Sequence, residues 1–271
     1  MERILRRDRR VAAVALAVLC ALAWTYLLAG AGMGMSLADA AAFSLFPHER
    51  AMSGTPDAMA EPRWSAAYAA LTAAMWWVMM IAMMTPSAAP MILLQARVAR
   101  HAQATGKDPD GGLNQSALFV AGYLLVWLAF AIAATALEWL LEAAGWVSAM
   151  MMSSVSAGFT AGVLIAAGVY QFTPLKNACL RQCRAPFAFL TRHWRPGRLG
   201  AARLGILHGA YCVGCCWALM ALLFVGGVMN PVWIAALAAV VLLEKLAGAG
   251  VLMSRLLGAL LIAWGIAALA T

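Results

Sequence analysis

Long apolar runs separated by short polar segments dominate the pattern of this chain. The runs cover about 11–31, 65–94, 115–141, 148–171, 204–228, 232–246 and 250–270. A helix needs about 20 apolar residues to cross the hydrocarbon core of a bilayer, and most of these runs reach that length. The pattern therefore predicts an all-α polytopic transmembrane helical bundle of about seven spans. A six-span bundle, with the segment after Pro231 re-entrant, is the alternative.

Composition agrees with a membrane protein, since 65% of the residues are apolar and only 11% are charged. The basic residues gather in three segments, 1–10, 95–114 and 173–203. Short cytoplasmic segments carry an excess of Lys and Arg, so all three are expected inside, with the N-terminus cytoplasmic. The net charge of +8 follows from this clustering and does not indicate nucleic-acid binding.

Three regions follow from this arrangement: an N-terminal span over 1–31, an extracytoplasmic segment over 32–64, and a transmembrane bundle over 65–271. The first run resembles a signal peptide. It is longer than the apolar region of such a peptide and lacks a small-residue cleavage site, so we expect it to be retained. The role of 32–64 stays open.

Candidate metal ligands stand out in the run over 204–228. His208, Cys212, Cys215 and Cys216 are spaced i, i+4, i+7 and i+8. At roughly 100° per residue they fall within about a quarter-turn of one helical face. Thiolate and imidazole in an apolar span form a soft ligand set. The ordinary alternative is packing, because buried cysteines behave as small hydrophobes.

A second pair of thiols, Cys179 and Cys183, lies in the basic segment that follows Pro174. If Pro174 begins a helix at the inner surface, both thiols share one face of it. Neighbouring arginines would favour the thiolate. The alternative is an amphipathic interfacial helix that simply buries its cysteines.

A methionine cluster lies in the run over 65–94. Met75, Met79 and Met83 are spaced i, i+4, i+8, and Met80 and Met84 lie on the adjoining face. Thioethers are neutral, soft ligands that select Cu(I). Because one straight helix cannot surround an ion with all four residues of the His/Cys stripe, we expect part of the ligand set to come from Met79, Met80, Met83 or Met84.

Glu244 and Lys245 interrupt the end of an apolar run, and an ionisable residue inside a membrane is a candidate functional group. Both side chains have the alternative of snorkelling to the interface. Glu244 is the candidate closest in membrane level to the cysteines. Motifs for a P-loop, HExxH, GxSxG or a dinucleotide site are absent, so no catalytic or cofactor-binding residue is assigned.

Three stretches together resemble a bacterial family of predicted metal-binding integral membrane proteins of unknown function. They are WWVMMIAMMTPSAAP, YQFTPLKNACLRQCRAPFAFL and GILHGAYCVGCCWALMALLFVGGVMN, the last followed by Glu244-Lys245. The resemblance covers roughly 64–250. It implies metal binding at the Cys, His and Met positions in a bacterial inner membrane, and it implies no reaction.

The leading hypothesis is a Cu(I)-handling membrane protein that delivers, stores or transports the ion, with zinc as the alternative metal. Its expected partners are the metal ion, the lipid bilayer, and a membrane or periplasmic metalloprotein. Two other functions remain open: a membrane thiol–disulfide or quinone-linked oxidoreductase, and a structural subunit of a larger membrane complex.

Overall fold

Helices make up nearly all of the computed structural model, which describes residues 2–29, 64–106, 113–148, 152–247 and 250–270. Those residues contain no strand, and the only β-pairing among them is an isolated bridge between Val147 and Ser154. This confirms the predicted all-α fold. The helices are α1 (Glu2–Leu28), α3 (Ala66–Ala104), α4 (Leu113–Ala143), α5 (Ala157–Tyr170), α6 (Pro174–Arg184), α7 (Pro186–His193), α8 (Arg198–Ala221), α9 (Leu223–Gly226), α10 (Pro231–Leu246) and α11 (Gly250–Leu269).

Local sequence explains where several helices begin. The Ser65 hydroxyl accepts a hydrogen bond from the amide of Tyr68 at the start of α3. Thr173 caps α6 in the same way, and Pro174 occupies its first turn, as the sequence suggested. Asn230 caps α10 ahead of Pro231. Side chains of this kind satisfy amide groups that have no partner within the helix.

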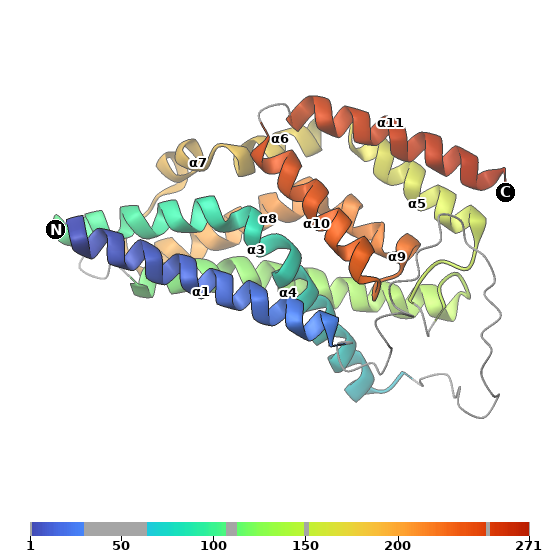
Figure 1. The fold of residues 1–271 in the computed structure, drawn as a ribbon, viewed down its shortest axis with the longest axis horizontal. Helices are drawn as coiled ribbons and strands as arrows, with labels where there is room; N and C mark the ends of the chain where they lie inside the picture. The colour runs from blue at the N-terminus through green and yellow to red at the C-terminus, as the bar shows by residue number, and fades with distance from the viewer. Residues whose placement is uncertain (1, 30–63, 107–112, 149–151, 248–249, 271) are drawn as a thin grey trace.

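Helix α3 continues through Pro86 and Pro90 to Ala104 and changes direction along its length (Figure 1). The polar loop expected over 95–114 therefore begins later than the sequence suggested. Gln95 and Arg100 lie on this extended part of the helix and are buried there. The helix ends before Gly106, which adopts a positive φ of 70°, a conformation that glycine takes readily.

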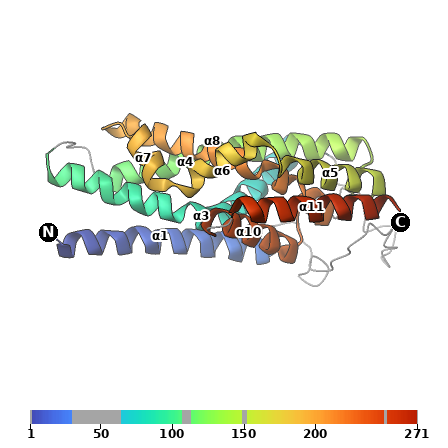
Figure 2. The ribbon, with the colours of Figure 1, turned by 90° about the horizontal axis from the view of Figure 1, so that it is seen from above.

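Close packing between α4 and α8 forms one side of the bundle. A Cβ on Gly205 would collide with the Phe119 carbonyl, and one on Gly122 would collide with that of Ala202. Small residues let two helix backbones approach in this way. Helix α3 packs against α4, and α1 packs against α3, whereas α5 and α11 run side by side near the C-terminus (Figures 1 and 2). Helix α10 crosses obliquely against α3 and links the two parts.

Five helices of the described chain are long and apolar enough to cross a membrane, over Val11–Leu28, Ala66–Ala104, Asn114–Ala143, Arg198–Gly226 and Gly250–Leu269. The pair α5 and α6, bent by 65° at its break, makes a sixth if it is counted as one span. Helix α10 has only 16 residues. The described residues thus contain at most six candidate spans, which is the smaller of the two numbers predicted from the sequence. Nearly all of the segment expected to be extracytoplasmic, residues 32–63, lies outside the described residues.

Candidate metal centre

Helix α8 carries the whole His/Cys stripe and buries it. Cys212, Cys215, Cys216 and His208 are each at most 3% exposed. All six cysteines of the chain are free thiols. The thiols of Cys215 and Cys216 both donate to the carbonyl of Cys212, at 3.1 and 3.0 Å from Sγ to oxygen. These bonds lie within one helical turn, so they hold the two thiols close to the third.

One thiol from another helix completes the thiol cluster, by which we mean Cys183, Cys212, Cys215 and Cys216. The Cys183 thiol of α6 interacts electrostatically with that of Cys215. The Cys216 Sγ also lies 3.9 Å from the Sδ of Met84 in α3. Helices α3, α6 and α8 therefore bring five sulfur-bearing side chains into one buried region.

A buried ammonium group lies against this cluster. The Nζ of Lys245, in the last turn of α10, donates to the Cys212 Sγ at 3.0 Å and to the Ser87 hydroxyl at 2.9 Å. Lys245 is 5% exposed and interacts electrostatically with all four thiols. The side chain therefore does not snorkel out of the bundle, as one interpretation of the sequence had it.

Tyr123 of α4 also contacts the cluster. Its hydroxyl donates to the Met84 carbonyl at 3.3 Å, and the same oxygen lies 3.2 Å from the Cys212 Sγ. Tyr123 is buried. The tyrosine hydroxyl thus ties together the two helices that supply Cys212 and Met84.

His208 lies within an aromatic enclosure one turn before Cys212. The centroid of its ring is 5.4 Å from that of Phe189, 5.8 Å from that of Tyr123 and 6.1 Å from that of Phe119. Its Nδ1 is buried, and no hydrogen-bond partner for it lies in the described part of the chain. A buried polar atom in that condition is unusual in proteins. This nitrogen is therefore available for a ligand.

The structure brings Cys179 to the same region as the thiol cluster, on the side of α8 that faces α6. Its Sγ would be 2.7 Å from a Cβ built on Gly214, so the side chain packs directly against the backbone of α8. Its thiol also interacts electrostatically with that of Cys215. Cys183 reaches the cluster itself, whereas Cys179 lies beside it.

The methionine cluster is part of the buried core, because Met75, Met79, Met80, Met83 and Met84 are each at most 1% exposed. Met84 is the member whose sulfur contacts a cysteine of the cluster. Met79, Met80 and Met83 lie on the same helix, within the turn and a half before it. They remain predicted ligands, for which the described contacts give no direct support.

Glu244 belongs to a separate buried network. Its carboxylate accepts hydrogen bonds from the Lys176 Nζ at 2.8 and 2.9 Å and from the Ser254 hydroxyl at 2.8 Å. Lys176 also donates to Gln171. These residues join α5, α6, α10 and α11 near the α5–α6 break. The carboxylate that the sequence offered as a further site candidate is thus paired with a lysine, and it does not snorkel either.

The donor atoms are of the kind that binds a soft ion, but the side chains are not arranged around a common point where an ion could sit. In the described residues, no three His, Cys, Asp or Glu side chains form a group able to hold a metal ion as they stand. Two thiols are turned toward the Cys212 carbonyl, and the Cys212 sulfur faces an ammonium group. Rotation about χ1 releases both thiols, because their hydrogen bonds are weak S–H···O contacts.

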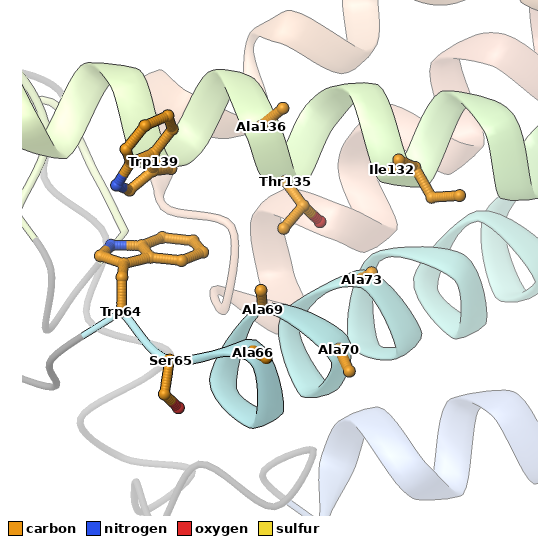
Figure 3. Close-up of a pocket in the computed structure, with 10 residues that line it drawn as sticks. All are labelled: Trp64, Ser65, Ala66, Ala69, Ala70, Ala73, Ile132, Thr135, Ala136 and Trp139. Carbon is orange, nitrogen blue, oxygen red and sulfur yellow. The ribbon is translucent and has the colours of Figure 1, made fainter.

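A groove of about 550 Å³ lies elsewhere, between the first turns of α3 and the second half of α4. Figure 3 shows the indole rings of Trp64 and Trp139 facing each other across one end. Its last residue on α3, Ala73, precedes Met84 by 11 positions, roughly 16 Å along a helix. The groove does not coincide with the thiol cluster.

Sequence reasoning missed three contributors to the site: Ser87, Tyr123 and the Cys212 contact of Lys245. Ser87 and Tyr123 carry no signal of their own, because each matters through a partner 89 or more positions away. Lys245 did carry a signal, since a lysine next to a glutamate in an apolar run is costly unless both are paired. The sequence could not indicate which partner each would take.

A model of a family described as copper chaperones (PpoB2) matches residues 73–268. The matched region contains the thiol cluster, Met84, Lys245 and His208. No curated protein and no solved structure matches the chain significantly. The match agrees with the metal-related part of the resemblance inferred from the sequence and supports a copper-handling role. Because the model covers most of the chain, this protein belongs to the copper chaperone family.

Proposed function

We propose that the protein is a membrane-embedded copper chaperone that holds Cu(I) at the thiol cluster and passes it to a metalloprotein partner. The observation that carries this proposal is the contact at 3.9 Å between the Cys216 Sγ and the Met84 Sδ. It joins a thiol and a thioether from two helices 132 positions apart. Thiolate and thioether together are the ligands that favour Cu(I) over harder ions.

Cys212 and Cys216 are the proposed thiolate ligands, with Met84 as the neutral third donor. The two cysteines are one helical turn apart on the same face of α8. Ligation requires both to lose their protons, and the ion remains Cu(I) throughout. Cys215, Cys183, Cys179 and the Nδ1 of His208 are further donors nearby. Such a set allows the ion to change ligands during transfer.

Exposed apolar side chains support a membrane location. Val14 on α1, Leu125 on α4 and Leu252 on α11 are each at least 56% exposed, and many similar residues lie on the outer faces of these helices. Soluble proteins rarely expose such wide apolar surfaces. In lipid the same surfaces need no further cover. These surfaces support a membrane location, and together with the basic N-terminal segment they support our proposal of a bacterial inner membrane protein with a cytoplasmic N-terminus.

The test is copper retention by the double variant Cys212→Ser/Cys216→Ser. Protein is purified in detergent under reducing conditions, and bound copper is counted by mass spectrometry. We expect the wild-type protein to retain copper and the double variant to lose it, while both unfold at the same denaturant concentration. Cys20→Ser is the matched control, because Cys20 lies on α1 and bonds only to the Ala82 carbonyl among the described residues. Full copper occupancy in the double variant would disprove the assignment of this pair.

A further inference from the structure

We propose that Lys245 is a fixed counter-ion that makes the thiol cluster select a monovalent soft cation. This inference rests on the proposed function and adds the basis of metal selectivity. Its origin is the geometry of the ammonium group, which is buried, lies 3.0 Å from the Cys212 Sγ and also donates a hydrogen bond to the Ser87 hydroxyl.

No carboxylate neutralises Lys245 in the described part of the chain, where its hydrogen-bond partners are Ser87 and Cys212. The neighbouring acid, Glu244, is already paired with Lys176. A buried charge without a partner is strongly unfavourable. The charge of Lys245 is therefore balanced by the thiol cluster, and the ammonium interacts with every thiol in it.

The charge balance then differs between metals. Two cysteine thiolates around Cu(I) carry a net charge of −1, which the ammonium of Lys245 cancels. The same two thiolates around Zn²⁺ or Cd²⁺ are neutral, so the ammonium would be left without a counter-charge in an apolar interior. A buried charge of that kind is penalised much more than a balanced pair. The cluster therefore favours Cu(I) or Ag(I) whenever two thiolates bind the ion.

The position of Lys245 suits this role. It lies in the last turn of α10, and α10 packs against both α3 and α8. The charged group therefore comes from a helix that carries none of the proposed ligands. Substitution of Lys245 consequently removes charge without removing a sulfur donor.

The experiment compares Cu(I), Ag(I) and Cd²⁺ binding by wild-type protein and Lys245→Met, which keeps side-chain length and removes charge. We expect the Cu(I) and Ag(I) affinities to fall at least about tenfold, as for loss of a charge-assisted hydrogen bond. The Cd²⁺ affinity, followed by thiolate charge-transfer absorption, should be unchanged or higher. Arg203→Met, which removes an exposed charge from α8, should change none of the three.

Three results would overturn the inference: an unchanged Cu(I) affinity, a higher one, or an equal loss for Cu(I) and Cd²⁺. A higher affinity would make Lys245 a competitor of copper, and an equal loss would make its role purely structural. Failure of the proposed function is distinguishable, because the wild-type protein would then hold no copper at the cysteines at all. An Arg at position 245 provides a second check, since Lys245→Arg restores charge and should recover preference for the monovalent ions.

Discussion

The buried pair of Lys176 and Glu244 gives a sharp test of how the bundle is held together. Lys176 is fully buried and Glu244 is 2% exposed. In Glu244→Gln the shape of the side chain is kept, but the ammonium of Lys176 loses its counter-charge. Removing one partner of a buried ion pair costs about 3–5 kcal/mol. We expect a loss of that size in the free energy of unfolding.

The double variant Lys176→Met/Glu244→Gln should recover much of this loss, because replacing both members of a buried pair is often close to neutral. Gln171, which accepts from Lys176, then loses its donor at a cost of about 1–3 kcal/mol. The assay is equilibrium unfolding in mixed detergent micelles followed by tryptophan fluorescence. A single variant within about 1 kcal/mol of wild type, or a double variant no more stable than the single, would refute the reasoning.

The same variant decides the role of Glu244. Folded Glu244→Gln should retain copper at the wild-type stoichiometry, because its carboxylate is occupied by Lys176 and Ser254. Loss of copper from folded Glu244→Gln protein would instead make Glu244 a ligand.

Two further predictions concern packing and topology. Gly205→Ala should lower the free energy of unfolding by about 1–3 kcal/mol, because the added methyl group overpacks against Phe119. The control Gly162→Ala has open space around its Cβ and should cause no such loss. If the two variants lose equal stability in denaturant unfolding, α4 and α8 are not closely packed. Reporter fusions after Arg97 and after Arg198 should both give cytoplasmic signals, because both residues lie within basic segments. An extracytoplasmic signal from either would reverse the orientation proposed here.

Much of the fold was predictable because apolar run length and caps are local properties. Pro174 predicted the start of α6, and the spacing of Cys212 and Cys216 predicted one buried face of α8. The end of α3 was not predictable, since Gln95 and Arg100 look like loop residues until their burial is known.

Only part of the site could be predicted from the sequence, because contacts between helices are not local properties. Helical spacing places Cys212, Cys215 and Cys216 together, but it says nothing about which side chains face them from other helices. Charge patterning flagged Glu244 and Lys245 as neighbours, whereas the fold points them in different directions, one to Lys176 and the other to Cys212. Adjacent residues on a helix are about 100° apart, which lets Glu244 and Lys245 of α10 face different partners.

The 65° break between α5 and α6 has a consequence for the number of sulfur donors. Three thiols of the cluster lie on α8, but Cys183 lies on α6, beyond the break. The near side of the break is fastened to α8 by the Tyr170 hydroxyl, which donates to the Gly214 carbonyl at 2.5 Å. A tilt of the α6 arm about this fastening would move Cys183 away from Cys215 and leave only the three thiols of α8 together. The angle of the broken helix therefore determines whether a fourth thiol adjoins them.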